Sequence, residues 1–267
     1  MIVTLDAGHY GKYNQSPVNK NFYESDFTWK MCNYMAKFFK EADVKVRFTR
    51  SKKDVDKALF ERGYYAKGSN IFLSIHANAC DTERVDYPIV IRGYNEKETN
   101  KLALKLAEKI QEVMNTLQDG RTAIRKGKTG NEYYGVLRGA KAGNVRYRFI
   151  IEHSFYTNKE AVNFLLDDKK VEKLAKAEVD VILNYFNIKT QAQIISDRKH
   201  YVKVLVNDLN IRKIADWKAS PIFTVSRGDI FTVIDTVQPK NGNTKMYKLK
   251  SGLYITACDK YVEDYYK

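Results

Sequence analysis

Cysteine is scarce in this sequence, and its few occurrences lie far apart. The 267 residues include three cysteines, Cys32, Cys80 and Cys258, which is an odd number without close spacing. Small disulfide-stabilised domains and CxxC metal sites both need closely spaced cysteines. The sequence therefore argues against a disulfide framework and against a cysteine-based metal site, and it predicts free thiols.

Long apolar stretches are also missing. No tract approaches the roughly 20 consecutive apolar residues that a membrane-spanning helix needs. The opening MIVTLDAGHYG enters a strand-like pattern at once, which leaves no room for the basic and apolar regions of a signal peptide. With 44% hydrophobic residues the chain can still bury a core. We expect a soluble protein without membrane insertion and without a visible export signal.

Acidic residues are few relative to basic ones. Lys and Arg total 46 against 32 Asp and Glu, which gives a net charge of +14. Such a charge attracts polyanions at long range, so nucleic acid, anionic membranes and anionic cell-wall polymers are all candidate partners. No helix-turn-helix, zinc-finger or ribonucleoprotein motif is present, so we do not predict specific nucleic-acid binding.

Short apolar runs alternate with helical patterns through residues 1–188. The strand-like runs cover residues 2–6, 44–49, 70–76, 87–94 and 148–155. The helical patterns cover residues 24–40, 55–67, 99–117 and 158–185, and the last is long enough for two helices. This alternation predicts an α/β fold with a mostly parallel twisted sheet flanked by helices. In such sheets ligands gather at the carboxyl ends of the strands.

The pattern of apolar and polar residues changes after residue 188. Residues 189–200 are polar without clear periodicity, which is typical of a linker. Residues 201–267 contain a series of short strand-like runs separated by turn residues such as Asn-Asp, Ser-Pro and Asn-Gly. Regular short strands with turn punctuation predict a second domain that is a small all-β barrel or sandwich.

Two histidines fall at the carboxyl ends of predicted strands. His9 follows Gly8, where glycine would let the backbone turn sharply, and His76 closes the run NIFLSIH, whose alternation puts Ser74 and His76 on one face. A lone histidine is ordinarily a polar surface or hydrogen-bonded core residue, so each could be structural. Two imidazoles with a carboxylate nevertheless form a zinc ligand set that leaves one coordination position open.

Two carboxylates compete for the third ligand position. Glu24 begins a helical pattern in which apolar residues continue at helical spacing, and Asp26 lies two positions later on a different face. A carboxylate in the first helical turn is also favoured by the helix dipole, so Glu24 could be a simple charge compensation. The residues alone leave this choice open.

A further carboxylate lies inside an apolar strand. Glu152 belongs to the run RFIIEHSF, and an unpaired carboxylate in such a place costs several kcal/mol. A nearby metal with its bound water would compensate this charge. Extended geometry places Ile150, Glu152 and Ser154 on one face and His153 on the other, so we expect His153 to face away from the site.

The ordered motifs LDAGHYG, FTRSKKDVDKALFERGYYAK, NIFLSIHANA and IIEHSFYTNKEA, together with the helix at Glu24, carry a family resemblance. Over residues 1–188 the chain resembles the catalytic domain of zinc-dependent N-acetylmuramoyl-L-alanine amidases of the amidase-3 family, found in bacterial autolysins and phage endolysins. The resemblance implies that His9, Glu24 and His76 bind Zn²⁺ and that Glu152 is the catalytic glutamate. The chain departs from the family at VDYPIVIRGYN and at His153, where a small or apolar residue is commoner.

The C-terminal domain has a looser resemblance. The stretches LNIRKIADWKASPIFTVSRGDIFTVID and MYKLKSGLYITACDKYVEDY resemble a bacterial SH3-like cell-wall-binding domain over residues 201–267. This implies a small SH3-like barrel that targets the wall, with a ligand that the sequence leaves open. A β-domain that only stabilises the enzyme is the alternative.

The resemblance implies an activity. The chain is expected to be an endolysin-type peptidoglycan hydrolase that uses zinc-activated water to cleave the amide bond between N-acetylmuramic acid and L-alanine. Its expected partners are peptidoglycan and anionic wall polymers, and it would stay in the host cytoplasm until lysis and then act at the cell wall. The alternatives are another zinc peptidase acting on wall peptides and a non-catalytic wall-binding protein. Co²⁺ or Mn²⁺ could occupy the same ligands.

Overall fold

The computed structural model describes residues 1–128, 131–190, 193 and 198–267. The chain divides into two compact units, Met1–Thr190 and Gln191–Lys267. Half of the predicted linker, residues 189–200, lies outside the described residues. None of the helices within the described ranges has the length and apolar character needed to cross a membrane.

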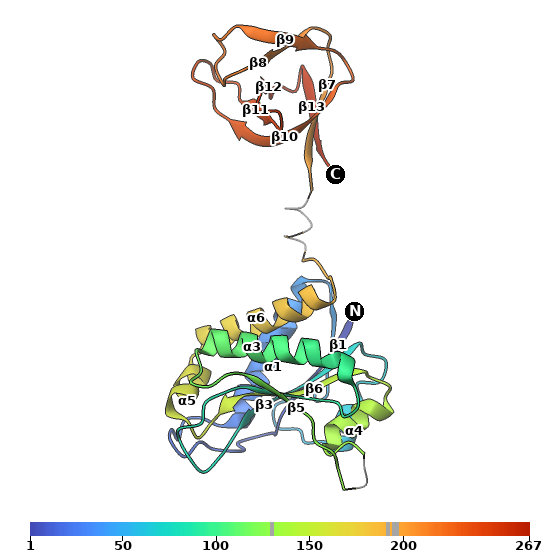
Figure 1. Cartoon of the computed structure of the whole chain (residues 1–267), viewed down its shortest axis with the longest axis vertical. Helices are drawn as coiled ribbons and strands as arrows, with labels where there is room; N and C mark the ends of the chain where they lie inside the picture. The colour runs from blue at the N-terminus through green and yellow to red at the C-terminus, as the bar shows by residue number, and fades with distance from the viewer. Residues whose placement is uncertain (129–130, 191–192, 194–197) are drawn as a thin grey trace. The chain divides into compact units, whose positions relative to one another are not determined.

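The first unit is a six-stranded sheet with helices on both faces, as Figure 1 shows. Its strands, in the spatial order β2-β1-β3-β6-β4-β5, are β1 (Ile2–Ala7), β2 (Lys45–Phe48), β3 (Ile71–Asn78), β4 (Ile89–Arg92), β5 (Arg121–Ala123) and β6 (Tyr147–Phe155). Its helices are α1 (Glu24–Glu41), α2 (Leu59–Tyr64), the short 3-10 helix η1 (Lys97–Thr99), α3 (Asn100–Met114), α4 (Gly135–Ala142), α5 (Lys159–Leu166) and α6 (Asp168–Tyr185).

Strand direction divides this sheet into two parts. Strands β1, β2, β3 and β6 run parallel to one another, whereas β4 is antiparallel to β6 and β5 is parallel to β4. The predicted α/β class with a parallel-containing sheet is confirmed. The parallel part brings the carboxyl ends of β1, β3 and β6 to one edge, and ligands collect at such edges.

Alternation along the strands separates two apolar cores. Leu5, Leu73 and Ile151 belong to the large core that α1, α3 and α6 also line. Phe72 and Ile150 belong to a smaller core with residues of α4. Because side chains alternate between the faces of a sheet, Phe72, Ser74 and His76 share one face, as the sequence predicts.

The structure corrects the predicted elements in three places. Helix α2 is shorter than residues 55–67, and the sequence analysis missed both β5 and α4. A Cβ atom on Gly139 of α4 would lie 2.0 Å from the Phe60 carbonyl oxygen, and one on Gly63 of α2 would lie 1.9 Å from the Val136 carbonyl oxygen. Glycine lowers helix propensity, so α4 depends on this close contact with α2 rather than on its local sequence.

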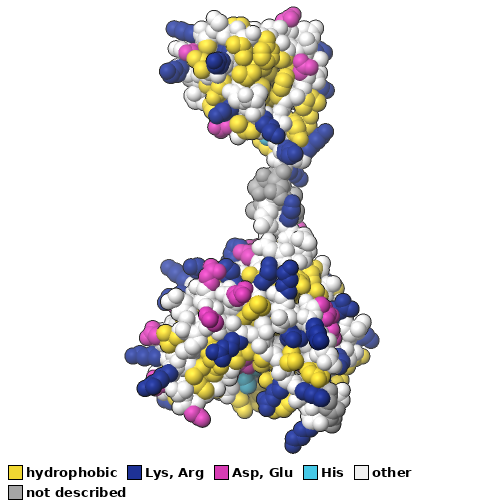
Figure 2. All heavy atoms as spheres, in the orientation of Figure 1, with side chains coloured by type: hydrophobic (Ala, Val, Ile, Leu, Met, Phe, Trp, Pro, Cys, Tyr) yellow, Lys and Arg dark blue, Asp and Glu magenta, His cyan; other side chains and the backbone are white. Residues whose placement is uncertain are grey.

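The second unit is a seven-stranded antiparallel sheet. Its strands, in the order β13-β7-β10-β11-β12-β8-β9, are β7 (His200–Val204), β8 (Leu209–Arg212), β9 (Pro221–Val225), β10 (Ile230–Val237), β11 (Met246–Leu249), β12 (Tyr254–Thr256) and β13 (Val262–Tyr266). The predicted all-β character is confirmed. A compact core that includes Val202, Ile211, Leu249 and Ile255 holds the strands together. Lys and Arg side chains are scattered over the visible face of each unit in Figure 2.

Candidate metal centre

His9 reaches the site from a tight turn after β1. The turn lies at His9 itself, which has a left-handed φ of 57°, and not at Gly8 as the sequence suggested. Gly8 is needed for space, because a Cβ there would lie 2.4 Å from Cε1 of His76. The Gly8 N–H donates to the Ile75 carbonyl at 3.0 Å, and its carbonyl accepts from the Thr28 hydroxyl at 2.6 Å. These two hydrogen bonds attach the turn after β1 to β3 on one side and to α1 on the other.

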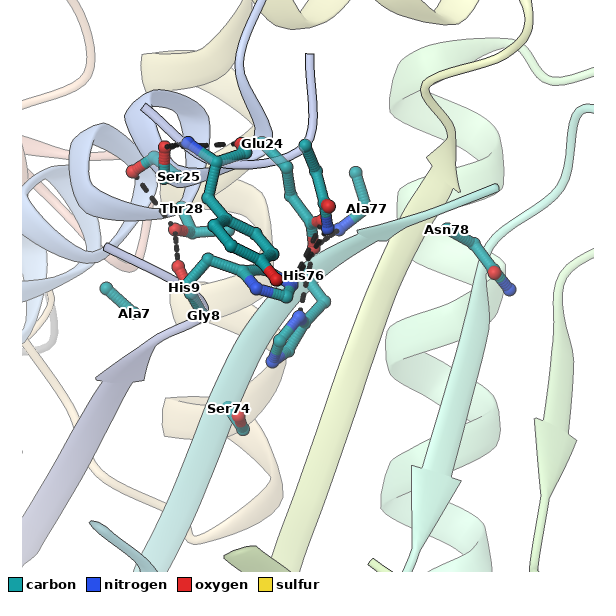
Figure 3. A network of polar contacts seen from close by, with 12 residues as sticks. Ala7, Gly8, His9, Glu24, Ser25, Thr28, Ser74, His76, Ala77 and Asn78 are labelled. Carbon is teal, nitrogen blue, oxygen red and sulfur yellow. Dashed lines mark hydrogen bonds and ion pairs between the residues drawn. The ribbon is translucent and has the colours of Figure 1, made fainter. Parts of the chain in front are cut away.

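Glu24 lies between the two histidines. Its Oε2 atom is 3.1 Å from His9 Nε2, and its Oε1 atom is 3.0 Å from His76 Nδ1. The backbone N–H of Ala77 donates to the same Oε1 atom at 3.0 Å, and Figure 3 shows His76 and Ala77 converging on the carboxylate. The Glu24 side chain is only 2% exposed, so it is held on several sides.

The three side chains form a compact group of possible metal ligands. One donor atom from each of His9, Glu24 and His76 lies within 4.8 Å of the others. The His9 and His76 side chains are 28% and 17% exposed, so an entering molecule can reach the imidazoles. Two imidazole nitrogens and one carboxylate oxygen match the nitrogen and oxygen ligands that zinc prefers in catalytic sites.

Burial and charge work against each other at Glu24 and His76. Burial alone would raise the pKa of Glu24, but hydrogen bonds from His76 and His9 outweigh it and hold this pKa far below its usual value. Burial alone would lower the pKa of His76, but the hydrogen bond and charge of Glu24 raise it. The carboxylate therefore stays ionised, as a metal ligand must be.

Glu152 lies beside this group on the neighbouring strand. It is in register with His76 across the parallel pair β3 and β6, and in register with Ile89 across the antiparallel pair β6 and β4. Within the described residues, no group donates a hydrogen bond to its buried Oε2 atom. The pKa of Glu152 is raised to about 7, mainly by burial; the charge of His76 opposes this rise and the charge of Glu24 adds to it. Such a carboxyl can hold or release a proton near neutral pH.

His153 faces the opposite side of the sheet, as predicted. Its ring is fully buried, meets Phe27 of α1 edge to face, and lies 2.8 Å from Glu178 Oε1 on α6. Its Nδ1 donates to the backbone carbonyl of His76 at 3.0 Å. Burial alone would lower the pKa of His153, but the charge of Glu178 raises it. Both ring nitrogens face acceptors, an arrangement that favours the protonated ring behind the site.

Asp26 points away from the two histidines. Its carboxylate forms ion pairs with Lys12 and Lys53, each at 2.5 Å. Its side chain is 29% exposed, whereas that of Glu24 is 2% exposed. The structure therefore brings Glu24, and not Asp26, into the group of possible ligands.

A buried ion pair beneath the site escaped the sequence analysis. Asp6 of β1 is fully buried and accepts two hydrogen bonds from Arg62 of α2, both at 2.8 Å. The hydroxyls of Thr49 and Ser74 donate to the same carboxylate at 2.6 and 2.7 Å. A charge inside an apolar strand needs a partner, so Asp6 in LDAGH could have indicated a buried ion pair. The sequence did not show which arginine forms that pair.

Known proteins provide three comparisons. A phage relative, the endolysin of Bacillus phage SPP1, is 29% identical over 98% of this chain and 97% of its own length. Cwp6 from Clostridium difficile matches 68% of this chain with a TM-score of 0.60 and 24% identity, and this chain spans only 29% of Cwp6. The catalytic domain of CwlV from Bacillus (Paenibacillus) polymyxa var. colistinus, an N-acetylmuramoyl-L-alanine amidase, matches 70% of this chain and 99% of its own, with a TM-score of 0.59 and 20% identity.

The two solved structures show that the first unit has the fold of these proteins. The model of the N-acetylmuramoyl-L-alanine amidase family matches residues 3–184, which is more than half of the chain and includes all four candidate site residues. The chain belongs to the N-acetylmuramoyl-L-alanine amidase family.

Proposed function

We propose that this peptidoglycan hydrolase cleaves the amide bond between N-acetylmuramic acid and L-alanine with the help of a zinc ion held by His9, Glu24 and His76. Family membership and the full-length similarity to a phage endolysin support the substrate and the reaction. The observation that carries the metal assignment is the grouping of three donor atoms within 4.8 Å of one another. The proposed role of Glu152 is to carry the proton.

The residues present fit a zinc ion. The donor set is two imidazoles and an ionised carboxylate, and the unpartnered Oε2 of Glu152 points to a group that would compensate its charge. When bound, zinc supplies Lewis acidity, which brings the pKa of water toward about 7 and polarises a carbonyl group. The tight turn at His9 and the buried Glu24 would hold the ligands in place before the ion arrives.

Glu152 has the properties of a proton carrier for amide hydrolysis. With a pKa of about 7, its carboxylate can accept a proton from the attacking water. The new carbon–oxygen bond then forms, and the carbon–nitrogen bond breaks. Glu152 returns its proton to the departing amine of L-alanine, so the residue ends each cycle ionised again. The products are a free stem peptide and an intact glycan strand.

The second unit is proposed as an SH3-like cell-wall-binding domain. Its small size, its antiparallel strands and the similarity that extends over 98% of the chain to an endolysin support this role. The net charge of +14 supports an attraction to anionic wall polymers as well as to peptidoglycan. A chain with this organisation would act at the cell wall.

The reaction is tested by digesting purified peptidoglycan and identifying the new ends. We expect new N-terminal L-alanine without new reducing sugar ends, loss of activity on chelation, and recovery with zinc. Glu24→Gln is expected to abolish the activity, whereas the matched variant Asp26→Asn, two positions away, is expected to retain it. New termini between other amino acids would instead indicate a peptidase, and an absence of cleavage would indicate a wall-binding protein.

A further inference from the structure

The loop before α1 is docked onto the first turn of that helix. The backbone N–H of Tyr13 donates to the Ser25 hydroxyl at 2.9 Å, and that hydroxyl donates to the Gly11 carbonyl at 2.7 Å. The N–H of Glu24 donates to the carbonyl of Asn14 at 3.0 Å. The first N–H groups of a helix have no hydrogen-bond partner within the helix. The Asn14 carbonyl satisfies one of them and so fixes the start of α1 at Glu24.

Asn14 also holds the side chain of Glu24. Its Nδ2 atom donates to Glu24 Oε2 at 2.5 Å and lies 3.2 Å from His9 Nε2. The backbone of Asn14 is left-handed, with φ of 53°, which asparagine tolerates better than most residues. Asn14 thus binds Glu24 at two points, through its backbone carbonyl and through its amide.

Tyr13, the residue before Asn14, contacts the candidate ligand His9. The ring of Tyr13 stacks on the His9 imidazole, with 5.0 Å between centroids and an interplanar angle of 9°. Two adjacent loop residues therefore contact the candidate ligands: Tyr13 contacts His9, and Asn14 contacts both Glu24 and His9. An amide is suited to this position because it donates a hydrogen bond without bringing a positive charge that would compete with a cation.

We infer that Asn14 is a positioning residue of the metal centre, whose amide orients the Glu24 carboxylate for metal binding. This inference rests on the proposed zinc site and extends it beyond the ligands. Groups that orient metal ligands through hydrogen bonds commonly change metal affinity by about 10- to 100-fold when they are removed.

Asn14→Gly tests this role, because glycine accepts the left-handed backbone and removes only the side chain. Asn115→Gly is the matched control, since Asn115 is an exposed asparagine with φ of 54° at the end of α3. The zinc dissociation constant of the full chain is measured by competition with a chromophoric chelator. The metal-free unfolding midpoint and the visible spectrum of the Co²⁺ form are measured on the same samples.

We expect Asn14→Gly to bind zinc about 10- to 100-fold more weakly, with a changed Co²⁺ spectrum and a metal-free midpoint like that of the control. Unchanged affinity in Asn14→Gly would overturn the inference while leaving the zinc site intact. A loss of affinity that is matched by a large fall in the metal-free midpoint would also overturn it, because Asn14 would then only stabilise the loop. Wild-type protein that binds no zinc would overturn the proposed metal centre itself.

Discussion

His76 of β3 and Glu152 of β6 are paired in register across two parallel strands. The parallel pairing brings a candidate metal ligand and a candidate proton carrier together although they are far apart in the sequence. Both lie on the sheet face opposite the large apolar core, beside Glu24 of α1.

Glu152→Gln is predicted to lower the rate of peptidoglycan cleavage by about 10²- to 10⁴-fold, because glutamine has nearly the same shape but cannot accept the proton. Zinc affinity is expected to stay within a few-fold of wild type. The measurement is the rate of release of N-terminal L-alanine at saturating zinc. Glu160→Gln serves as control, since it removes an exposed carboxylate on α5. Equal activity of wild type and Glu152→Gln would exclude Glu152 as the proton carrier.

The same variant has a predicted effect on the stability of the metal-free protein. The pKa of Glu152 is raised from 4.5 to about 7 in the folded state. The unfolded chain therefore releases this proton first as the pH rises from 4.5 to 7, and stability is lost over that window. Above pH 7 the ionised, unpartnered carboxylate costs on the order of 1–3 kcal/mol.

We therefore expect metal-free Glu152→Gln to be more stable than metal-free wild type at pH 8 and nearly equal to it at pH 4. Urea unfolding after chelation, at both pH values, measures the difference. A wild-type protein that gains stability relative to the variant between these values would show that Glu152 has a partner in solution.

Gly8→Ala is predicted to weaken zinc binding and activity by more than about tenfold, because its Cβ would lie 2.4 Å from Cε1 of His76 and displace the imidazole. Gly11→Ala is the control: its Cβ would meet no described atom within 4 Å, although its φ of +56° brings a strain of about 1 kcal/mol. Isothermal titration with zinc compares the two. If Gly11→Ala has the larger effect on zinc binding, backbone strain matters more than the space beside His76.

The buried pair of His153 and Glu178 is predicted to be costly to break. Glu178→Ala should destabilise the protein by about 3–5 kcal/mol because it leaves a charged ring without its partner. Replacing both residues by leucine should recover most of this loss, since buried ion pairs can often be exchanged for apolar residues. Chemical unfolding of the single and double variants measures the coupling. A double variant that is as unstable as Glu178→Ala would contradict the prediction that the lost stability comes from the unpaired charge.

Much of the fold was accessible from the sequence because its elements have strong local patterns. Helix α1 begins at Glu24 as predicted, and the alternation in β6 places Glu152 and His153 on opposite faces. Helix α4 was missed because its glycines are favourable only where they meet α2. The three-residue strand β5 is too short to give a periodic signal.

The supporting groups of the site were harder to predict than the candidate ligands. The ligands follow strand ends and a helix start, which are local features. The pairing of Asp6 with Arg62 joins residues of two different elements, and the contact of Asn14 with Glu24 depends on a left-handed loop residue. Both arise from tertiary packing, which a single sequence does not specify.

The central claim is that His9, Glu24 and His76 hold a zinc ion beside Glu152. The most direct measurement is an anomalous difference map at the zinc absorption edge, from crystals of the full chain grown with one equivalent of zinc. We predict one strong peak per chain, within about 2.0–2.2 Å of one atom from each of the three residues. A peak ligated by other residues, or no peak at these side chains, would contradict the proposed metal centre.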